Sequence, residues 1–232
     1  MSPDITHPRS IRSFVLRNSR MTAGQKKALE HHWPDYGIEL QPQLPDLDRA
    51  FKRRAPRVLD IGTGMGDTTI EMARKRPDLD FLAVEVHQPG VGNLLRRAHE
   101  ERLANVRIIS ADILEVLAQD TLINAFDTVL ILFPDPWPKK RHHKRRLIKP
   151  AFLRSLLPCM RPHGRLYIAT DWLNYADHIL EVCEAHPALE NLAGPGRYAP
   201  RPLWRPATKF ETRGLDLGHE VRDFAFRVRP AA

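Results

Sequence analysis

Four acidic residues follow successive apolar runs of the sequence, and their side chains could serve one ligand: Asp60, Glu85, Asp112 and Asp135. A carboxylate after the second run can accept hydrogen bonds from both hydroxyls of a ribose. A carboxylate after the third run can meet an adenine amino group, and one near the first run suits a ligand that carries an ammonium. S-adenosylmethionine has all three parts and no phosphate, so the pattern predicts this cofactor.

A glycine-rich loop follows the first acid, with glycines at positions 62, 64 and 66 of LDIGTGMGD. Glycines permit tight turns and a close approach of the backbone to a ligand. The loop lacks the Lys-Ser/Thr pair of a P-loop and the spacing GxGxxG, and a carboxylate beside it would repel a pyrophosphate. Alternatively, each acid caps the helix that follows it; four acids in register favour the cofactor. The predicted cofactor-binding residues are Asp60, Gly62, Gly64, Glu85, Asp112 and Asp135.

The elements that would position these acids follow from a regular alternation after residue 55. Apolar runs (RVLDIG, FLAVEV, VRIIS, FDTVLILF, GRLYIATD) alternate with helical stretches, which predicts an α/β fold with a mostly parallel sheet and helices on both faces. A final run, DFAFRVR, has no helix after it and can pair antiparallel at the sheet edge. Such sheets bind ligands beyond the carboxyl ends of their strands. We expect an N-terminal basic segment with entry helices (1–54) and a main domain (55–232).

The fourth acid, Asp135, lies in FPDPWPKKRHHKRR between two prolines, which fix their own φ and restrict their neighbours. Six Lys or Arg and two His follow within residues 139–146. Positive charges at this density repel one another. Beside a site of methyl transfer, they indicate binding to a phosphate backbone. The formal net charge of +8 agrees with a polyanionic partner. Trp137 can stack on a base or pack against the strand end, and DPW faintly resembles the (D/N)PP(Y/F) box of amino-methylating enzymes.

Other features limit the class of protein. The two cysteines, Cys159 and Cys183, form neither a disulfide framework nor a CxxC pair. The histidines of the basic block have no Cys or acid nearby, so we expect no metal. With no Cys near Asp135, covalent methylation of a pyrimidine carbon is disfavoured. The chain has no apolar leader and no apolar run long enough to span a bilayer, which predicts a cytoplasmic protein without a membrane partner.

Several stretches make the chain resemble the bacterial tRNA (guanine-N7)-methyltransferase family, whose members are class I S-adenosylmethionine-dependent methyltransferases. These stretches are IRSFVLRNSRMTAGQ, LDIGTGMGD, VEVHQPGVG, FPDPWPKKRHHKRRL, ATDW and TKFETRG, and the resemblance covers nearly the whole chain. It implies a Rossmann-like, seven-stranded sheet with an antiparallel last strand. It also implies methylation of N7 of a guanosine in the tRNA variable loop, at position 46 in tRNA numbering. The family often has Glu where Asp60 stands, so this shorter acid needs a nearer ligand or a bridging water.

The resemblance also implies roles for individual residues, with Asp135 as the catalytic residue. The implied substrate-binding residues are Lys139, Asp171, Thr208, Lys209, Phe210 and Glu211. The implied RNA-binding residues are Arg141, His142, His143, Lys144, Arg145 and Arg146.

The chemistry of guanine N7 limits what these residues can do. N7 carries an in-plane lone pair, so we expect Asp135 to orient the ring and to stabilise developing positive charge rather than to act as a base. Because N7 must face the methyl group, guanine is selected at its N1–H and amino edge, for which Asp171 and Glu211 are candidates. Alternatively, Asp171 caps the next helix and Glu211 pairs with Arg213. Two other functions stay open: an amino-methylating enzyme acting on another nucleic acid or protein, and an RNA-binding module without activity.

Overall fold

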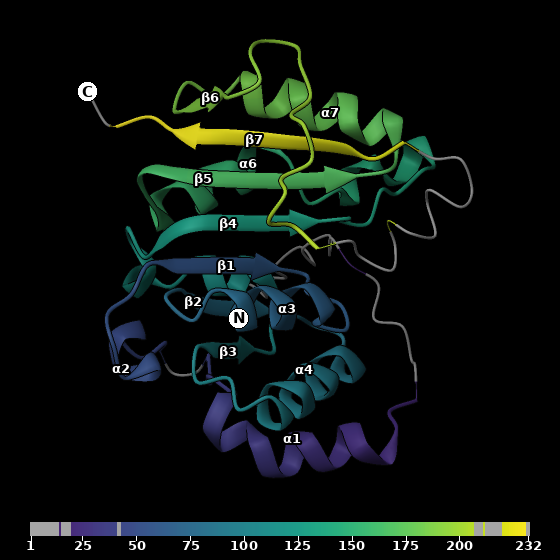
Figure 1. The fold of residues 1–232 in the computed structure, drawn as a ribbon. Helices are drawn as coiled ribbons and strands as arrows, with labels where there is room; N and C mark the ends of the chain where they lie inside the picture. The colour runs from purple at the N-terminus through teal and green to yellow at the C-terminus, as the bar shows by residue number, and fades with distance from the viewer. Residues whose placement is uncertain (1–13, 15–19, 41–42, 207–210, 212–219, 231–232) are drawn as a thin grey trace, which may run out of the picture.

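The computed structural model describes residues 14, 20–40, 43–206, 211 and 220–230. Within these residues the chain forms one seven-stranded sheet in the order β3-β2-β1-β4-β5-β7-β6, and β7 runs antiparallel to both of its neighbours (Figure 1). The prediction of a mostly parallel sheet with an antiparallel last strand is confirmed. The strands are β1 (Arg57–Ile61), β2 (Asp80–Val84), β3 (Val106–Ile109), β4 (Phe126–Leu132), β5 (Met160–Thr170), β6 (Leu189–Asn191) and β7 (Arg222–Val228).

Helices cover both faces of the sheet, as the alternation predicts. One buried cluster joins the sheet to α2, α5, α6 and α7, and another joins its opposite face to α1, α3 and α4. The helices are α1 (Ala23–Tyr36), α2 (Leu47–Phe51), α3 (Asp67–Lys75), α4 (Gln88–Glu100), α5 (Ile113–Leu117), α6 (Pro150–Leu156) and α7 (Leu173–Glu184). Short 3₁₀ helices η1 (Asp120–Leu122), η2 (Lys140–Arg145) and η3 (Leu157–Cys159) complete the elements.

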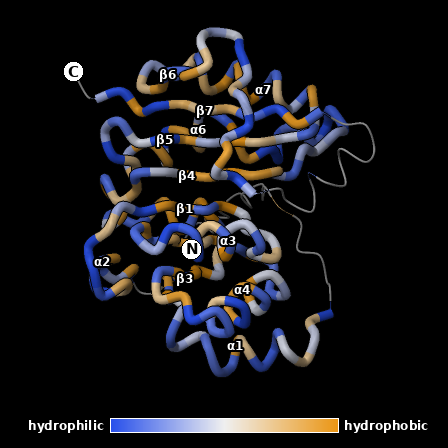
Figure 2. Tube along the Cα trace, in the orientation of Figure 1, coloured by the Kyte–Doolittle hydropathy of each residue, from blue (hydrophilic) through white to orange (hydrophobic). Residues whose placement is uncertain are grey.

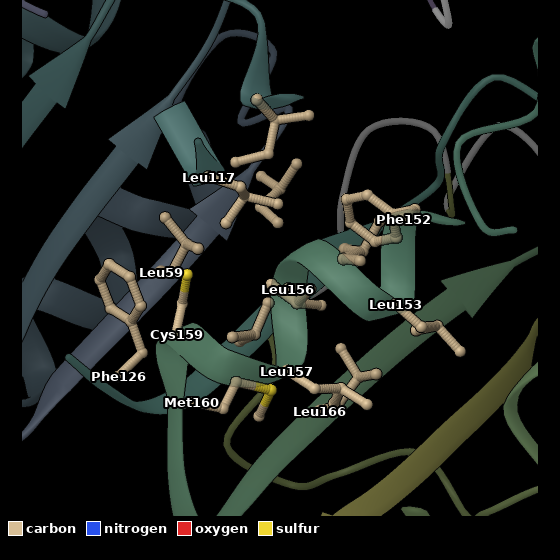
Figure 3. Packing of buried hydrophobic residues seen from close by; sticks show 14 of the residues in the cluster. Leu59, Leu117, Phe126, Phe152, Leu153, Leu156, Leu157, Cys159, Met160 and Leu166 are labelled. Atoms are coloured by element: carbon tan, nitrogen blue, oxygen red, sulfur yellow. The ribbon is translucent and has the colours of Figure 1, made fainter. Parts of the chain in front are cut away.

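The core strands are buried along their whole length because helices pack on both sides of them. All five residues of β1 and all five of β2 are buried, and apolar residues concentrate on the central strands (Figure 2). Cys159 lies among the apolar side chains of the first cluster (Figure 3). Burial raises the pKa of its thiol to about 11, which fits a small packing residue rather than a nucleophile.

The N-terminal helix α1 closes the β3 edge of the sheet. Thr22 caps it through a hydrogen bond from the backbone N–H of Gln25, whose side chain in turn accepts from the Thr22 N–H. After the helix, the N–H of Ile38 donates to the carbonyl of Ile108 in β3 at 2.8 Å. Helix α1, which precedes the expected boundary at residue 54, packs on α4, which follows it (Figure 1). The two sides of this boundary differ in sequence pattern but are in contact.

Candidate active site

A cavity of about 330 Å³ opens at the carboxyl ends of β1, β2 and β4. This is the edge where parallel α/β sheets bind ligands, and the volume suits a small molecule. Among the described residues that line it are the acids Glu85, Asp112 and Asp135, and the lining contains no Lys or Arg. The cavity therefore favours a ligand with positive charge and disfavours one with a pyrophosphate. Phe14 also lines it, a contribution from the N-terminal segment that the sequence analysis did not foresee.

Glu85 is buried and is held by three backbone N–H groups. One carboxylate oxygen accepts from the N–H of Gly64 at 2.7 Å, and the other accepts from Val86 and His87 at 2.8 Å each. A carboxylate offers about four acceptor positions, so capacity remains for ribose hydroxyls. These bonds fix the acid relative to the glycine loop, which supports its predicted place in a cofactor site.

Two glycines, one in the glycine loop and one in α4 beside it, are required for different reasons. Gly64 has φ +58°, although a Cβ there would meet no atom within 4 Å, so its conformation rather than its space excludes a side chain. Gly90, in the first turn of α4, presents the opposite case: a Cβ would lie 2.0 Å from the carbonyl oxygen of Gly64. Gly90 was missed as a site residue, although it stands in VEVHQPGVG; the signal was a glycine just after the acid of the second strand.

Asp60 is not among the described residues that line the cavity, and its contact with the cofactor stays a prediction. It lies within β1 rather than after it, and successive residues of a strand point to opposite faces. Its side chain points to the α3 side, where it accepts a hydrogen bond from the hydroxyl of Thr69 at 2.6 Å. Burial, opposed by the Thr69 hydrogen bond and assisted by the charge of Glu85, raises the pKa of Asp60 to about 6. Asp60 therefore links β1 to α3 through its side chain.

Asp112 both caps a helix and lines the cavity. One carboxylate oxygen accepts from the backbone N–H of Leu114 at 3.0 Å and so caps α5. The same residue lines the cavity. Capping and ligand contact are compatible because a carboxylate has two oxygens.

Asp135 is exposed at the mouth of the cavity, in a backbone loop of unusual conformation. The preceding Phe133 has φ +56° and the following Trp137 has φ +44°. Non-glycine residues adopt positive φ at a cost, and such positions persist only where the surrounding structure enforces them. Asp135 thus lies between two prolines and two residues of positive φ, and its fixed orientation stays a prediction.

The basic segment, residues 139–146, does not face solvent uniformly. Most of it forms η2, and Arg141 and Lys144 are exposed. Trp137 is covered by the chain itself: the guanidinium of Arg145 lies 4.9 Å from its ring centroid, and the ring of His142 meets its edge at 5.8 Å.

Arg146 corrects the prediction for this segment. It was expected to touch RNA, but it is 2% exposed. The reason is that its guanidinium is directed inward to hydrogen-bond with the carbonyl of Pro136 and the side chain of Asn174.

Glu211 also differs from its predicted role. It is buried, and both carboxylate oxygens accept from the guanidinium of Arg205, at 2.7 and 3.1 Å. Arg205 bridges further to Asp223 of β7 at 3.0 Å, and its guanidinium lies 5.9 Å from the ring of Phe133. Glu211 thus takes part in a buried ion pair with Arg205. Arg213, the partner in the alternative interpretation, lies outside the described residues.

The other predicted substrate residues have different positions. Lys139 is exposed at the start of η2, and Asp171 lies half-buried between β5 and α7. The position that caps α7 belongs to Trp172 rather than to Asp171. Thr208, Lys209 and Phe210 lie outside the described residues. In the described parts of the chain, no group of three or more His, Cys, Asp or Glu could hold a metal ion, and no helix is long and apolar enough to cross a membrane.

Comparison with known proteins agrees with this geometry. Residues 54–224 match a family model described as a putative methyltransferase. The solved structure of the 16S rRNA methyltransferase KamB has a similar fold, with a TM-score of 0.59 at 15% identity over 83% of this chain and 99% of that one.

Relatives of much higher identity span nearly the whole chain. The tRNA (guanine-N(7)-)-methyltransferase of Alkalilimnicola ehrlichii is 52% identical over 97% of this chain and 95% of its own length. That of Ectopseudomonas mendocina is 50% identical over 98% of this chain and 95% of its own length. Since these relatives are at least 50% identical over nearly the full length of both chains, the chain belongs to the tRNA (guanine-N(7)-)-methyltransferase family.

Proposed function

We propose that this chain transfers a methyl group from S-adenosylmethionine to N7 of a guanosine in tRNA, in the variable loop at position 46. The observation that carries the proposal is the cavity whose described lining holds Glu85, Asp112 and Asp135 but no Lys or Arg, beside a segment rich in exposed cations. An acidic cavity suits a cationic cofactor without phosphate, and an exposed basic segment suits a phosphate backbone. The named relatives support the choice of tRNA and of guanine N7.

The residues that would hold the cofactor follow from their positions. Glu85, fixed by three backbone N–H groups, would accept from the ribose hydroxyls, and Asp112 would meet the adenine amino group. Gly64 lets the backbone approach the ligand closely. When bound, S-adenosylmethionine supplies an electrophilic methyl group on a sulfonium.

Asp135 would act on the acceptor base without removing a proton. Guanine N7 already has a free lone pair, and the methylated product is cationic. A carboxylate in a fixed orientation stabilises the developing charge and orients the ring. The left-handed backbone on either side of the proline pair supports such a fixed orientation. Asp171, half-buried between β5 and α7, would accept from the N1–H and amino edge of guanine.

The basic segment would hold the phosphates that deliver this guanosine. Arg141 and Lys144, exposed on η2, are the best-placed contacts. The tRNA would meet the protein in the cytoplasm, which the buried, unpaired thiols of Cys159 and Cys183 support.

One experiment tests the proposed function directly. The protein is incubated with S-adenosylmethionine labelled in its methyl group and with bulk tRNA, and the tRNA is digested to nucleosides. Label in 7-methylguanosine, mapped by fragment analysis to the variable loop, is the expected result. Label in another nucleoside or in protein would favour an amino-methylating enzyme, and tight tRNA binding without any label would favour an RNA-binding module.

The Asp135→Ala variant tests the role of the proline-flanked acid. We expect transfer to fall by about 10²-fold or more, as for the loss of other oriented charges in active sites, while tRNA binding persists. A variant with full turnover would contradict the assignment of Asp135. Binding of tRNA, measured in parallel by filter retention, separates this loss from a failure to fold.

A further inference from the structure

Arg146 ends the basic segment, yet its side chain is one of the largest fully buried ones among the described residues. Burial of a guanidinium is costly unless its N–H groups are satisfied, and burial lowers the pKa of Arg146. Its Nε donates to the carbonyl of Pro136 at 3.0 Å, and its Nη2 donates to Oδ1 of Asn174 at 2.7 Å. The guanidinium also lies 4.8 Å from the ring centroid of Tyr175. The charge is thus placed where a phosphate cannot reach it.

These contacts join two segments of the site. Pro136 follows Asp135 directly, and Asn174 lies three residues after Asp171, in the first turn of α7. Within the described chain, the hydrogen bonds of Arg146 go to carbonyl, amide and imidazole groups, and no salt bridge involves it. Its positive charge is therefore not used to neutralise an acid. What the side chain does is fix the distance between the proline loop and α7.

The geometry of η2 explains why this one arginine faces inward. A 3₁₀ helix has three residues per turn, so side chains three apart share one edge. The exposed edge carries Arg141 and Lys144, whereas Arg146 lies on the edge of His143, with its Nη2 3.2 Å from His143 Nε2 and its N–H bonded to the His143 carbonyl at 3.0 Å. The third edge, with His142 and Arg145, faces Trp137.

The proline loop needs such a constraint. Phe133 and Trp137 both have positive φ, and residues in that region persist only when their surroundings over-determine them. The carbonyl of Pro136 lies between these two positions, and Arg146 donates to it. Loss of the bond would free the loop to relax toward ordinary φ and would move the carboxylate of Asp135.

We propose that Arg146 is a positioning residue for methyl transfer, which acts on Asp135 through the carbonyl of Pro136 and on the Asp171 segment through Asn174. It is not an RNA contact. The proposal rests on the proposed function, because it is the transfer step that depends on the orientation of Asp135.

The test compares Arg146→Gln with Arg141→Gln, which removes the same charge from the exposed edge of the same segment. Three quantities are measured: the single-turnover rate at saturating tRNA and S-adenosylmethionine, the Kd for tRNA at several salt concentrations, and the stoichiometry of S-adenosylmethionine binding. For Arg146→Gln we expect the rate per binding-competent site to fall by about 10²-fold, as for a displacement of about 1 Å, with the tRNA Kd within about twofold of wild type. For Arg141→Gln we expect weaker tRNA binding and a salt slope smaller by about 1.

A second variant keeps the test decisive if Arg146→Gln does not fold. Asn174→Ala removes an exposed partner of Arg146 without any change of charge. It should lower the saturated rate with an unchanged salt slope, and Arg146→Lys should recover part of the rate lost in Arg146→Gln. The inference is overturned if Arg146→Gln lowers the salt slope as Arg141→Gln does with a wild-type rate at saturation, or if Asn174→Ala keeps the full rate. A wild-type protein that forms no 7-methylguanosine would instead refute the proposed function.

Discussion

Replacement of Asp60 by Asn should change how the stability of the protein depends on pH. Asp60 is buried in β1, and within the described chain its side chain accepts a hydrogen bond from the hydroxyl of Thr69. Burial raises its pKa from 3.8 to about 6 in the folded protein. Asn has nearly the same shape and can accept the same hydrogen bond, but it does not titrate.

The sign and size of the effect follow from this pKa. Below pH 3.8 the carboxyl group is protonated in both the folded and the unfolded chain, and it contributes nothing to the pH dependence. Between that value and about 6 the unfolded chain releases the proton while the folded chain retains it, so the free energy of unfolding decreases as the pH rises. Above about pH 6 the cost is constant. Since each pKa unit corresponds to about 1.4 kcal/mol, the full cost is about 3 kcal/mol.

The assay is urea denaturation of wild type and Asp60→Asn at a series of pH values from 4 to 8. Because the unfolded carboxyl group is already more than half ionised at pH 4, the difference between the two free energies of unfolding should move by about 2 kcal/mol in favour of the variant between pH 4 and pH 7. Any packing defect of Asn is independent of pH and cancels from this change. Asp78→Asn is a control of opposite sign, because hydrogen bonds from Arg76 lower the pKa of Asp78. A difference between wild type and Asp60→Asn that stays constant from pH 4 to pH 8 would refute the argument.

Two other substitutions test the packing around the cavity. Gly90→Ala places a Cβ 2.0 Å from a carbonyl oxygen of the glycine loop. We therefore expect this variant to bind S-adenosylmethionine at least about tenfold more weakly, as measured by calorimetry. The control is Gly24→Ala, whose Cβ would have its nearest contact at 3.9 Å and which should bind the cofactor normally. Arg205→Met leaves the buried carboxylates of Glu211 and Asp223 without their shared partner, and should cost about 3–5 kcal/mol of stability at neutral pH in urea denaturation. An equal loss at pH 4 and pH 7 would contradict that reason, since protonation of the carboxylates should relieve it.

The sequence predicted the sheet because its strands and helices depend on local patterns. Apolar runs followed by acids marked the strand ends, and Glu85 and Asp112 both line the cavity. The direction of the Asp60 side chain, toward α3, was not predicted because β1 is buried on both faces. A strand of this kind shows no alternation of polar and apolar residues, so the sequence does not reveal which way one acid points.

The other features that the sequence did not predict depend on contacts between segments that are distant along the chain. The close approach of Gly90 to the loop at Gly64 depends on how α4 packs against β1, which no local pattern records. Arg146 meets Pro136 ten residues earlier and Asn174 28 residues later. Composition showed a block of charge, but burial of one member could be known only from the fold.

The three-residue period of the 3₁₀ helix η2 places the charges of the basic segment in different surroundings. Composition treats residues 139–146 as one basic patch, but a 3₁₀ helix divides them into edges. The edge of Arg141 and Lys144 is free to meet phosphate, the edge of Arg145 covers Trp137, and the edge that ends in Arg146 locks the proline loop. Adjacent residues of a 3₁₀ helix lie about a third of a turn apart. A single-residue insertion in η2 would therefore move each following side chain to a different edge of the helix. In the roles that we propose, the spacing within the segment, rather than its net charge, therefore couples RNA binding to the orientation of Asp135.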